Sequence, residues 1–511
     1  MSELSRREFL RLLGLLPLVS LSGKVALPPL PTGSNDSERP NFIILLFDSL
    51  AAPNVSLYGY PRRTMPHLER LAEGATVFHR HYANGNYTNP GTASLLTGTL
   101  PWTHRSLLIF SPVIETREEQ NIFRALAPED YYAFGYSHNL IAEALMYQFR
   151  QDIDQLKKTQ ELCLLDFHLS DQLFYKDYDL AAWRERSWRA GEKPHTYPSS
   201  AIFFTLNHQL WLRRKEKLEA EYRDRFPRGL PRQHDQIFLM EDAVDWLIAN
   251  TPRFPRPYLT YFHFTPPHIP YCTRREFYGL FDDGWAPPRK PEHHFTEDFS
   301  QEELDRLRME YDEYIAYVDA ELWRLYEHLE RAGQLDNTYL ILTSDHGEMF
   351  ERGIWMHITP VLYEPLIHIP LIIKRPGQTQ REDVHTPTSA IDVLPTLLHL
   401  AEQPIPDWCE GDVLPTLGGD IPADRPVFAI DSKSSYKQGP LTAATIAMLQ
   451  GRYKLIYYFG YQDFDEIYEL YDLENDPEEL HDLYDTETAV AQAMRQTLHA
   501  ALRDANQRNA V

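Results

Sequence analysis

Three unbroken apolar segments stand out along the chain, at residues 41–47 (NFIILLF), 258–264 (YLTYFHF) and 338–344 (TYLILTS). A continuous apolar run is typical of a strand that is buried on both faces of a parallel sheet. Each segment ends in polar or charged residues or is followed by them at once. We therefore predict three central strands whose carboxyl ends carry polar side chains.

Helical patterns lie between these strands. Residues 65–78 place apolar side chains at Leu68 and Leu71, and Gly74 ends the predicted helix before a short strand. Residues 304–333 form a long amphipathic pattern that ends at a glycine. Strands that alternate with helices and carry polar residues at their ends predict an α/β fold with a doubly wound sheet.

The pattern changes in two places. Residues 150–235 mix aromatic and charged residues with little period, which predicts a variable insertion that covers the site. Residues 41–420 form the predicted catalytic domain, and residues 421–511 a small α+β C-terminal subdomain. The elements predicted in that subdomain are strands at 425–430, 451–459 and 467–473 and a helix at 487–505.

The first residues resemble an export signal. Arg6 and Arg7 precede a short apolar run and then small residues, so residues 1–23 have the form of a twin-arginine signal. Residues 24–40 are rich in Pro and Ser and predict a linker. We expect the twin-arginine machinery to export the chain to the periplasm, cell surface or medium, with no transmembrane helix in the mature chain. The alternative is a chance basic segment before a core helix.

Charge limits the partners. The chain has 74 acidic and 50 basic residues, a formal net charge of −24. A nucleic-acid surface needs a basic footprint, so we expect no nucleic-acid partner. An anionic small molecule can still bind where a metal ion or a group of histidines lies in a pocket.

Four candidate residues stand at strand or turn ends: Asp48, Thr88 and the adjacent Asp345 and His346. Ligands of an open α/β sheet bind beyond the carboxyl ends of its strands, so these residues can converge. Two carboxylates, an imidazole and a hydroxyl oxygen suit one divalent cation, which would also acidify the Thr88 hydroxyl. The alternatives are a strand-capping Asp48, a turn at the Asp-His pair and a helix N-cap at Thr88.

At these residues the chain resembles the sulfatase family of the alkaline phosphatase superfamily. The opening strand with Asp48, the segment TNPGTASLLTG, the histidine segment YFHFTPPHIPY and the segment LILTSDHGE occur in the family's order. Later segments resemble the rest of the family's core and its C-terminal subdomain, so the resemblance covers about residues 40–485. It implies the family's fold and a metal-dependent ester hydrolase.

The chain departs from that family at the nucleophile. The resemblance implies a Cys or Ser that is converted to formylglycine, but Thr88 stands there, with Gly91 and Thr92 at the signature's Ser and Arg positions. Ser49 replaces the second Asp of the opening pair, and the Lys and His of the second signature are absent near Asn139. The formylglycine route is therefore not expected.

These departures resemble another branch of the superfamily, the catalytic domains of lipoteichoic acid synthases and phosphoethanolamine transferases. That resemblance implies a Thr nucleophile and a single metal ion held by Asp48, Thr88, Asp345 and His346. Enzymes of that branch usually have several transmembrane helices, so soluble sulfatase-like proteins with Thr in this position are the nearer comparison. One imidazole and a Thr oxygen favour Mn²⁺ or Zn²⁺, with Ca²⁺ or Mg²⁺ as alternatives.

Other polar residues receive weaker assignments. His268 and His357 match family positions near the substrate oxyanion and the leaving group, so we expect catalytic roles for both. Asn139 is a candidate substrate contact. His263 lies within a strand and is expected to be a core residue. Lys374 and Lys454 are candidate anion contacts, although solvated surface lysines are the more ordinary expectation.

The sequence favours an exported, metal-dependent hydrolase or transferase that forms a covalent intermediate at Thr88. Its substrate would be a small-molecule, glycan or lipid-headgroup ester of phosphate or sulfate. A phosphorylated Thr can be attacked again at phosphorus, whereas a sulfated Thr has no hemiacetal for elimination, so phosphoesters are preferred. The alternatives are an arylsulfatase-like sulfuric ester hydrolase without formylglycine and an inactive anion- or glycan-binding protein.

Overall fold

The computed structural model describes residues 39–166, 199–433, 439–462 and 466–508. The predicted export signal lies outside these residues, as does nearly all of the predicted linker. In the described ranges, no helix is both long enough and apolar enough to cross a bilayer.

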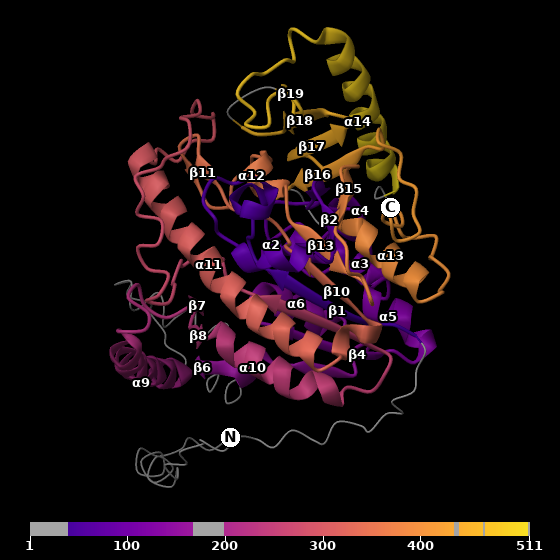
Figure 1. Ribbon diagram of the computed structural model, residues 1–511. Helices are drawn as coiled ribbons and strands as arrows, with labels where there is room; N and C mark the ends of the chain where they lie inside the picture. Colours follow the sequence, from indigo (N-terminus) through magenta and orange to yellow (C-terminus); the bar gives the residue numbers. More distant parts are fainter. Residues whose placement is uncertain (1–38, 167–198, 434–438, 463–465, 509–511) are drawn as a thin grey trace.

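A mixed sheet of eight described strands forms the centre (Figure 1). In spatial order, the strands are β14 (Glu382–Val384), β2 (Thr76–Phe78), β13 (Leu371–Lys374), β10 (Thr338–Thr343), β1 (Asn41–Phe47), β9 (Tyr258–Phe264), β4 (Tyr132–Ser137) and β5 (Gln155–Lys157). The three predicted central strands are adjacent and parallel, in the order β10, β1, β9. Strand β13 runs antiparallel to both of its neighbours, which makes the sheet mixed.

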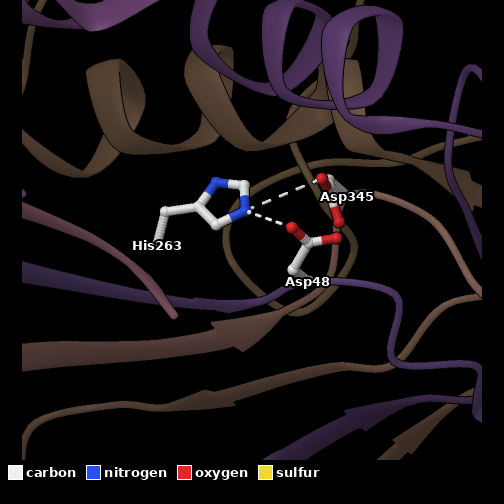
Figure 2. Close-up of side chains that lie close together, drawn as sticks. All are labelled: Asp48, His263 and Asp345. Atoms are coloured by element: carbon white, nitrogen blue, oxygen red, sulfur yellow. Dashed lines mark ion pairs between the residues drawn. The ribbon is translucent and has the colours of Figure 1, made fainter. Parts of the chain in front are cut away.

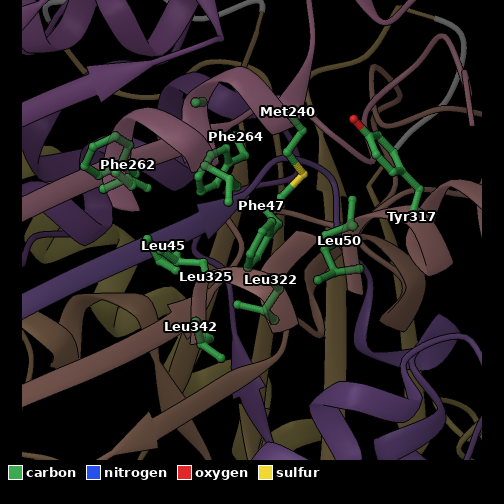
Figure 3. Packing of buried hydrophobic residues seen from close by; sticks show 14 of the residues in the cluster. Leu45, Phe47, Leu50, Met240, Phe262, Phe264, Tyr317, Leu322, Leu325 and Leu342 are labelled. Carbon is green, nitrogen blue, oxygen red and sulfur yellow. The ribbon is translucent and has the colours of Figure 1, made fainter. Parts of the chain in front are cut away.

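Helices cover both faces of this sheet. One layer holds α2 (Pro66–Ala72), α10 (Met240–Asn250) and α11 (Gln301–Arg331); the other holds α3 (Thr88–Thr97), α5 (Ile122–Leu126), α6 (Leu140–Gln148) and α13 (Val393–Leu400). Strand β1 has an apolar sequence because both of its faces are buried. Leu45 and Phe47 pack in the core beneath α11 (Figure 3), whereas Ile44 and Leu46 pack in the core beneath α3 and α13.

A smaller antiparallel sheet follows the main sheet, with strands in the order β16 (Val427–Asp431), β17 (Ala444–Gln450), β18 (Tyr453–Phe459) and β19 (Ile467–Asp472). Helix α14 (Thr488–Arg508) packs on one face of it through residues such as Met494 and Leu498. The opposite face packs on residues 361–367, which include the short helix α12 (Glu364–Ile367). The expected α/β fold with a small α+β C-terminal subdomain is confirmed by this arrangement.

The sequence prediction lacked β17, because its Ala and Thr residues give only a weak apolar signal. Part of the predicted insertion is described: helix α9 (Ser199–Tyr222) and strands β6 (Cys163–Leu165) and β7 (Arg232–Gln233). Both strands pair with β8 (Gln236–Phe238), which directly follows the predicted insertion. The remaining short strands are β3 (His81–Tyr82), β11 (Phe350–Glu351), β12 (Ile354–Trp355) and β15 (Thr388–Ser389), and α4 spans Pro101–His104.

Candidate active site

The ends of β1 and β10 are joined by polar contacts. The Ser344 hydroxyl donates to the Phe47 carbonyl (2.6 Å), and the Leu50 amide donates back to that hydroxyl (3.0 Å). The Ser49 amide donates to Asp345 Oδ1 (3.3 Å), and Ser49 adopts a left-handed conformation (φ 63°). These contacts hold the two carboxylates that follow the strands, Asp48 and Asp345, at the same edge of the sheet.

Two imidazoles face these carboxylates. His263 Nε2 lies 3.4 Å from Asp48 Oδ2 and 3.8 Å from Asp345 Oδ2 (Figure 2). His346 Nε2 lies 3.4 Å from Asp48 Oδ1 and 3.6 Å from Asp345 Oδ2. All four side chains are fully buried. The predicted residues Asp48, Asp345 and His346 therefore converge, as the sheet topology required.

His263, expected to be a core residue, also faces this cluster. The side chain is buried, but its ring points into the carboxylate cluster and its Nδ1 lies 3.0 Å from the Tyr261 hydroxyl. Strand register explains the position: His263 pairs with Leu46, so both side chains lie on the sheet face that Asp48 also occupies two residues later. The apolar content of β9 carries no sign of this position, because it depends on the register of β9 against β1.

The cluster suits a divalent cation. Nε2 of His263 and Nε2 of His346 are buried, and neither makes a hydrogen bond of normal geometry to a described residue. Three ligand atoms, one from each of Asp48, His263 and Asp345, all lie within 4.8 Å of one another. Two imidazole nitrogens without hydrogen-bond partners, facing two carboxylates, are a donor set that suits a divalent metal ion.

The pKa shifts of these buried groups also favour a bound cation. Burial alone would raise the pKa of the Asp48 carboxyl, but His268, His263 and His346 outweigh it and hold that pKa well below its usual range. Burial and the negative charge of Asp48 raise the pKa of Asp345 well above its usual range. Burial lowers the pKa of His346 to about 3. The negative charge of Asp345 is thus disfavoured in the protein alone, and a bound cation would favour it.

Thr88 lies next to this cluster. Thr88 is the first residue of α3, and the N-cap of that helix is Tyr87. The alternative that Thr88 is the N-cap is therefore wrong. The Asn139 side-chain amide donates to Thr88 Oγ1 (3.3 Å) and, by a short bond, to Asp48 Oδ2. Asn139 is itself the N-cap of α6, where its Oδ1 accepts from the Ile141 amide (2.7 Å). Asn139 therefore links the Thr88 hydroxyl to the carboxylate cluster.

The two other predicted histidines lie together. The rings of His268 and His357 are 5.0 Å apart, and those of His357 and His346 are 4.4 Å apart. His268 Nδ1 lies 2.7 Å from the Ile269 carbonyl, so Nδ1 carries the proton and Nε2 is free to accept one. His357 Nδ1 lies 3.1 Å from Glu348 Oε2, a fully buried carboxyl whose pKa burial raises to about 7. Sequence reasoning missed Glu348, although it belongs to the same SDHGE segment.

Thr88, His268 and His357 line one cavity of about 290 Å³. Arg232, Gln233 and His234, from the predicted insertion, line it as well. The hydroxyl and both imidazoles thus face a common space of the size that a small-molecule substrate occupies.

Neither lysine of the sequence prediction reaches this cavity. Lys454 is fully buried rather than solvated, because it pairs with Glu479 (2.7 Å) and Glu364 (3.1 Å) beneath the C-terminal sheet. Lys374 is half-buried and donates to the Gly74 carbonyl (2.9 Å). Both lysines therefore have structural partners.

Comparison with known proteins agrees with the fold. The family described as Sulfatase matches residues 40–403, and the family described as N-sulphoglucosamine sulphohydrolase, C-terminal, matches residues 355–508. The chain is 26% identical over 471 residues to the choline-sulfatase of Rhizobium meliloti (strain 1021), covering 86% of this chain and 82% of that protein. It is 29% identical over 261 residues to an uncharacterized sulfatase of Escherichia coli (strain K12), of which it spans 50%.

Among solved structures, the phosphonate monoester hydrolase of Silicibacter pomeroyi superposes with a TM-score of 0.63 at 22% sequence identity. The match covers 91% of this chain and 96% of that one, and it shows the shared fold. The family matches define a hydrolase of the alkaline phosphatase superfamily. Within that superfamily, the chain belongs to the sulfatase family.

Proposed function

We propose that this protein is a metal-dependent hydrolase or transferase of phosphate or sulfate esters, with Thr88 as the nucleophile. The observation that carries the proposal is the position of the Thr88 hydroxyl, which lines the cavity and is joined through Asn139 to the buried carboxylates. Thr88 also begins α3, and the amino end of a helix favours an anionic ester group.

Asp48, Asp345 and His346 would hold the metal ion, with His263 as a fourth candidate and Thr88 at its edge. The imidazoles favour Mn²⁺ or Zn²⁺, and Ca²⁺ or Mg²⁺ are the alternatives. When bound, such an ion would supply positive charge to the ester oxygens and lower the pKa of a coordinated hydroxyl. The orphaned Nε2 atoms of the two histidines support its presence.

Residues of the chain would carry out the bond making, the proton transfer and the positioning of the hydroxyl. Thr88 Oγ1 bonds to the phosphorus or sulfur atom while the bond from that atom to the leaving alcohol oxygen breaks. One imidazole, His268 or His357, accepts the Thr88 proton and delivers it to the leaving oxygen. Asn139 holds the hydroxyl through its amide N–H. Water or an acceptor alcohol then attacks the same atom and releases Thr88.

Phosphoester chemistry is the preferred reading, because a phosphorylated Thr is open to a second attack at phosphorus. Sulfuric ester hydrolysis without formylglycine is the second candidate. The resemblance to a choline-sulfatase over 86% of this chain favours it. An inactive anion-binding protein is disfavoured, since it would have no reason to keep all four groups of the buried cluster.

Two conservative substitutions at Thr88 test the proposal. The metal-loaded protein and its Thr88→Val and Thr88→Ser variants are assayed with an aryl phosphodiester and with the matching aryl sulfate. We expect turnover of the phosphodiester to fall by about three orders of magnitude or more in Thr88→Val, the loss that follows removal of a nucleophile, and to persist partly in Thr88→Ser. Equal turnover in wild type and Thr88→Val would contradict the proposal.

We also propose that residues 1–23 direct export through the twin-arginine machinery. Arg6 and Arg7 before an apolar run support this, although they lie outside the described residues. The test is a fusion of residues 1–40 to a reporter that is active only after export, with and without the double change Arg6→Lys and Arg7→Lys. Loss of exported reporter in the variant is the expected result; unchanged export would refute the assignment.

A further inference from the structure

The cavity beside Thr88 is lined mostly by side chains that the proposed catalysis does not use. Apart from the hydroxyl and the imidazoles, most of the cavity wall is apolar and comes from segments far apart in the sequence. Its apolar members include Ile109, Phe110, Ile141, Ile269, Met356 and Ile358.

The rim of this wall is unusually open to water. Phe110 is 51% exposed, Ile358 is 46% exposed and Ile109 is 44% exposed. Scattered exposed apolar residues are ordinary, but three around one cavity mouth form a patch of the kind that binds an apolar ligand group.

The backbone of this wall is held in an uncommon conformation. Phe110, His234 and Met356 all have positive φ angles (60°, 50° and 74°), which residues with a side chain rarely adopt. Asn89, the neighbour of Thr88, fixes Phe110 in place: its Oδ1 accepts from the Phe110 amide (3.1 Å). Its Nδ2 donates to the Ser111 carbonyl (3.0 Å). Such conformations persist where the surroundings enforce them, and they cluster at ligand sites.

The charge of the wall points to an uncharged group. Among the described residues that line the cavity, there is no Asp or Glu, and Arg232 contributes a positive charge. The aromatic ring of Tyr87 is already covered by an ammonium group, since Lys433 Nζ lies 4.4 Å from the ring centroid. A cationic alcohol such as choline would meet positive charge here and no carboxylate.

We infer that the alcohol portion of the substrate ester is an uncharged apolar group, aryl or alkyl, bound against Phe110 and Ile358. The inference deepens the proposed function and rests on it. Phe110 and Ile358 would determine specificity for the leaving alcohol, whereas the chemistry at Thr88 would be indifferent to it.

Binding without turnover tests this inference separately from catalysis. Calorimetry on the metal-loaded Thr88→Val protein compares phenyl phosphate with phosphocholine, which differ in the alcohol portion. We expect phenyl phosphate to bind at least tenfold more tightly, the discrimination that an apolar pocket provides. Ile358→Ser, in the same background, should lose most of that preference by weakening phenyl phosphate alone.

Ile405→Ser is the matched control, because Ile405 is 41% exposed and does not line the cavity. Equal binding of the two esters, tighter binding of phosphocholine, or an effect of Ile405→Ser as large as that of Ile358→Ser would overturn the inference. Preferential binding of phenyl phosphate by a protein that turns over no ester would support an apolar binding wall but refute the proposed function, so the two failures are distinguishable.

Discussion

At the scale of single residues, the site depends on side chains that serve two elements at once. Asn139 caps helix α6 with its oxygen and reaches Asp48 and Thr88 with its nitrogen. His263 belongs to a central strand and also faces the carboxylate cluster. Because each side chain is fixed by the fold, the hydroxyl and the carboxylates are held in place before substrate binds.

Replacement of Asn139 by Asp separates these two tasks. Asn139→Asp keeps an N-cap oxygen but replaces the amide donor by a third carboxylate beside Asp48. We expect kcat/KM for the ester to fall about a hundredfold, the scale for loss of one donor at a reacting centre. Asn121→Asp is the matched control: Asn121 caps α5 and likewise donates to an Asp, Asp152 (2.9 Å), away from the site. Comparable activity losses in both variants would refute the role of Asn139.

His263 can be tested through metal content. His263→Phe removes one imidazole that faces both carboxylates while it retains an aromatic side chain in the core. We expect metal affinity, measured by titration with Zn²⁺ or Mn²⁺, to fall at least tenfold. The control is His138→Phe, because His138 is also fully buried, at the end of the adjacent strand β4, and stacks on Phe238. Unchanged affinity in His263→Phe would exclude His263 from the metal site.

At the scale of elements, the parts of the fold with a local signature could be predicted. Strands β1, β9 and β10 carry continuous apolar runs because both of their faces are buried, and helix α11 carries a clear period. The antiparallel direction of β13 has no such signature, since hydrophobicity does not encode strand direction. The convergence of Asp48 with Asp345 followed from the rule for parallel strands, whereas the contribution of His263 required the register.

Helix α3 approaches the end of β10 closely, and Gly91 permits it. A Cβ atom on Gly91 would lie 2.1 Å from the Asp345 carbonyl oxygen. We expect Gly91→Ala to destabilise the protein by about 1–3 kcal/mol through overpacking and to lower metal affinity by moving Asp345. Urea unfolding and metal titration would measure both effects.

Gly74→Ala is the control for that change, because the nearest atom there is the flexible end of Lys374 at 3.1 Å. Its expected effect on the free energy of unfolding is about 0.5 kcal/mol or less. If Gly91→Ala behaves like Gly74→Ala, helix α3 does not position the site through this contact.

At the scale of the whole molecule, the C-terminal subdomain is tied to the main domain by a buried ion cluster. Lys454 of β18 pairs with Glu364 of α12 and with Glu479, and all three are buried. Burial raises the pKa of Glu479 to about 7, whereas Lys454 lowers the pKa of Glu364 to about 2 against the effect of burial. Because Glu364 belongs to the main domain and Lys454 to the C-terminal sheet, we expect this cluster to link the stability of the two parts.

Removal of the Lys454 side chain should therefore lower the free energy of unfolding of both parts together. We expect Lys454→Met to cost about 3–5 kcal/mol, since two carboxyl groups remain buried without their partner. Lys374→Met removes hydrogen bonds to backbone carbonyls only, and about 1 kcal/mol is expected for it. Thermal unfolding of both variants gives the comparison; equal losses would argue against the link between the two sheets.

The central claim is that Thr88 forms a covalent bond to the transferred group. The most direct measurement is peptide mass spectrometry of the metal-loaded protein, quenched in acid during turnover of an aryl phosphodiester and, separately, of an aryl sulfate. The account predicts an adduct on the peptide that contains Thr88, formed with the phosphodiester and absent from Thr88→Val. Turnover in wild type and in Thr88→Val alike, with no adduct on that peptide, would contradict it and leave activated water as the nucleophile.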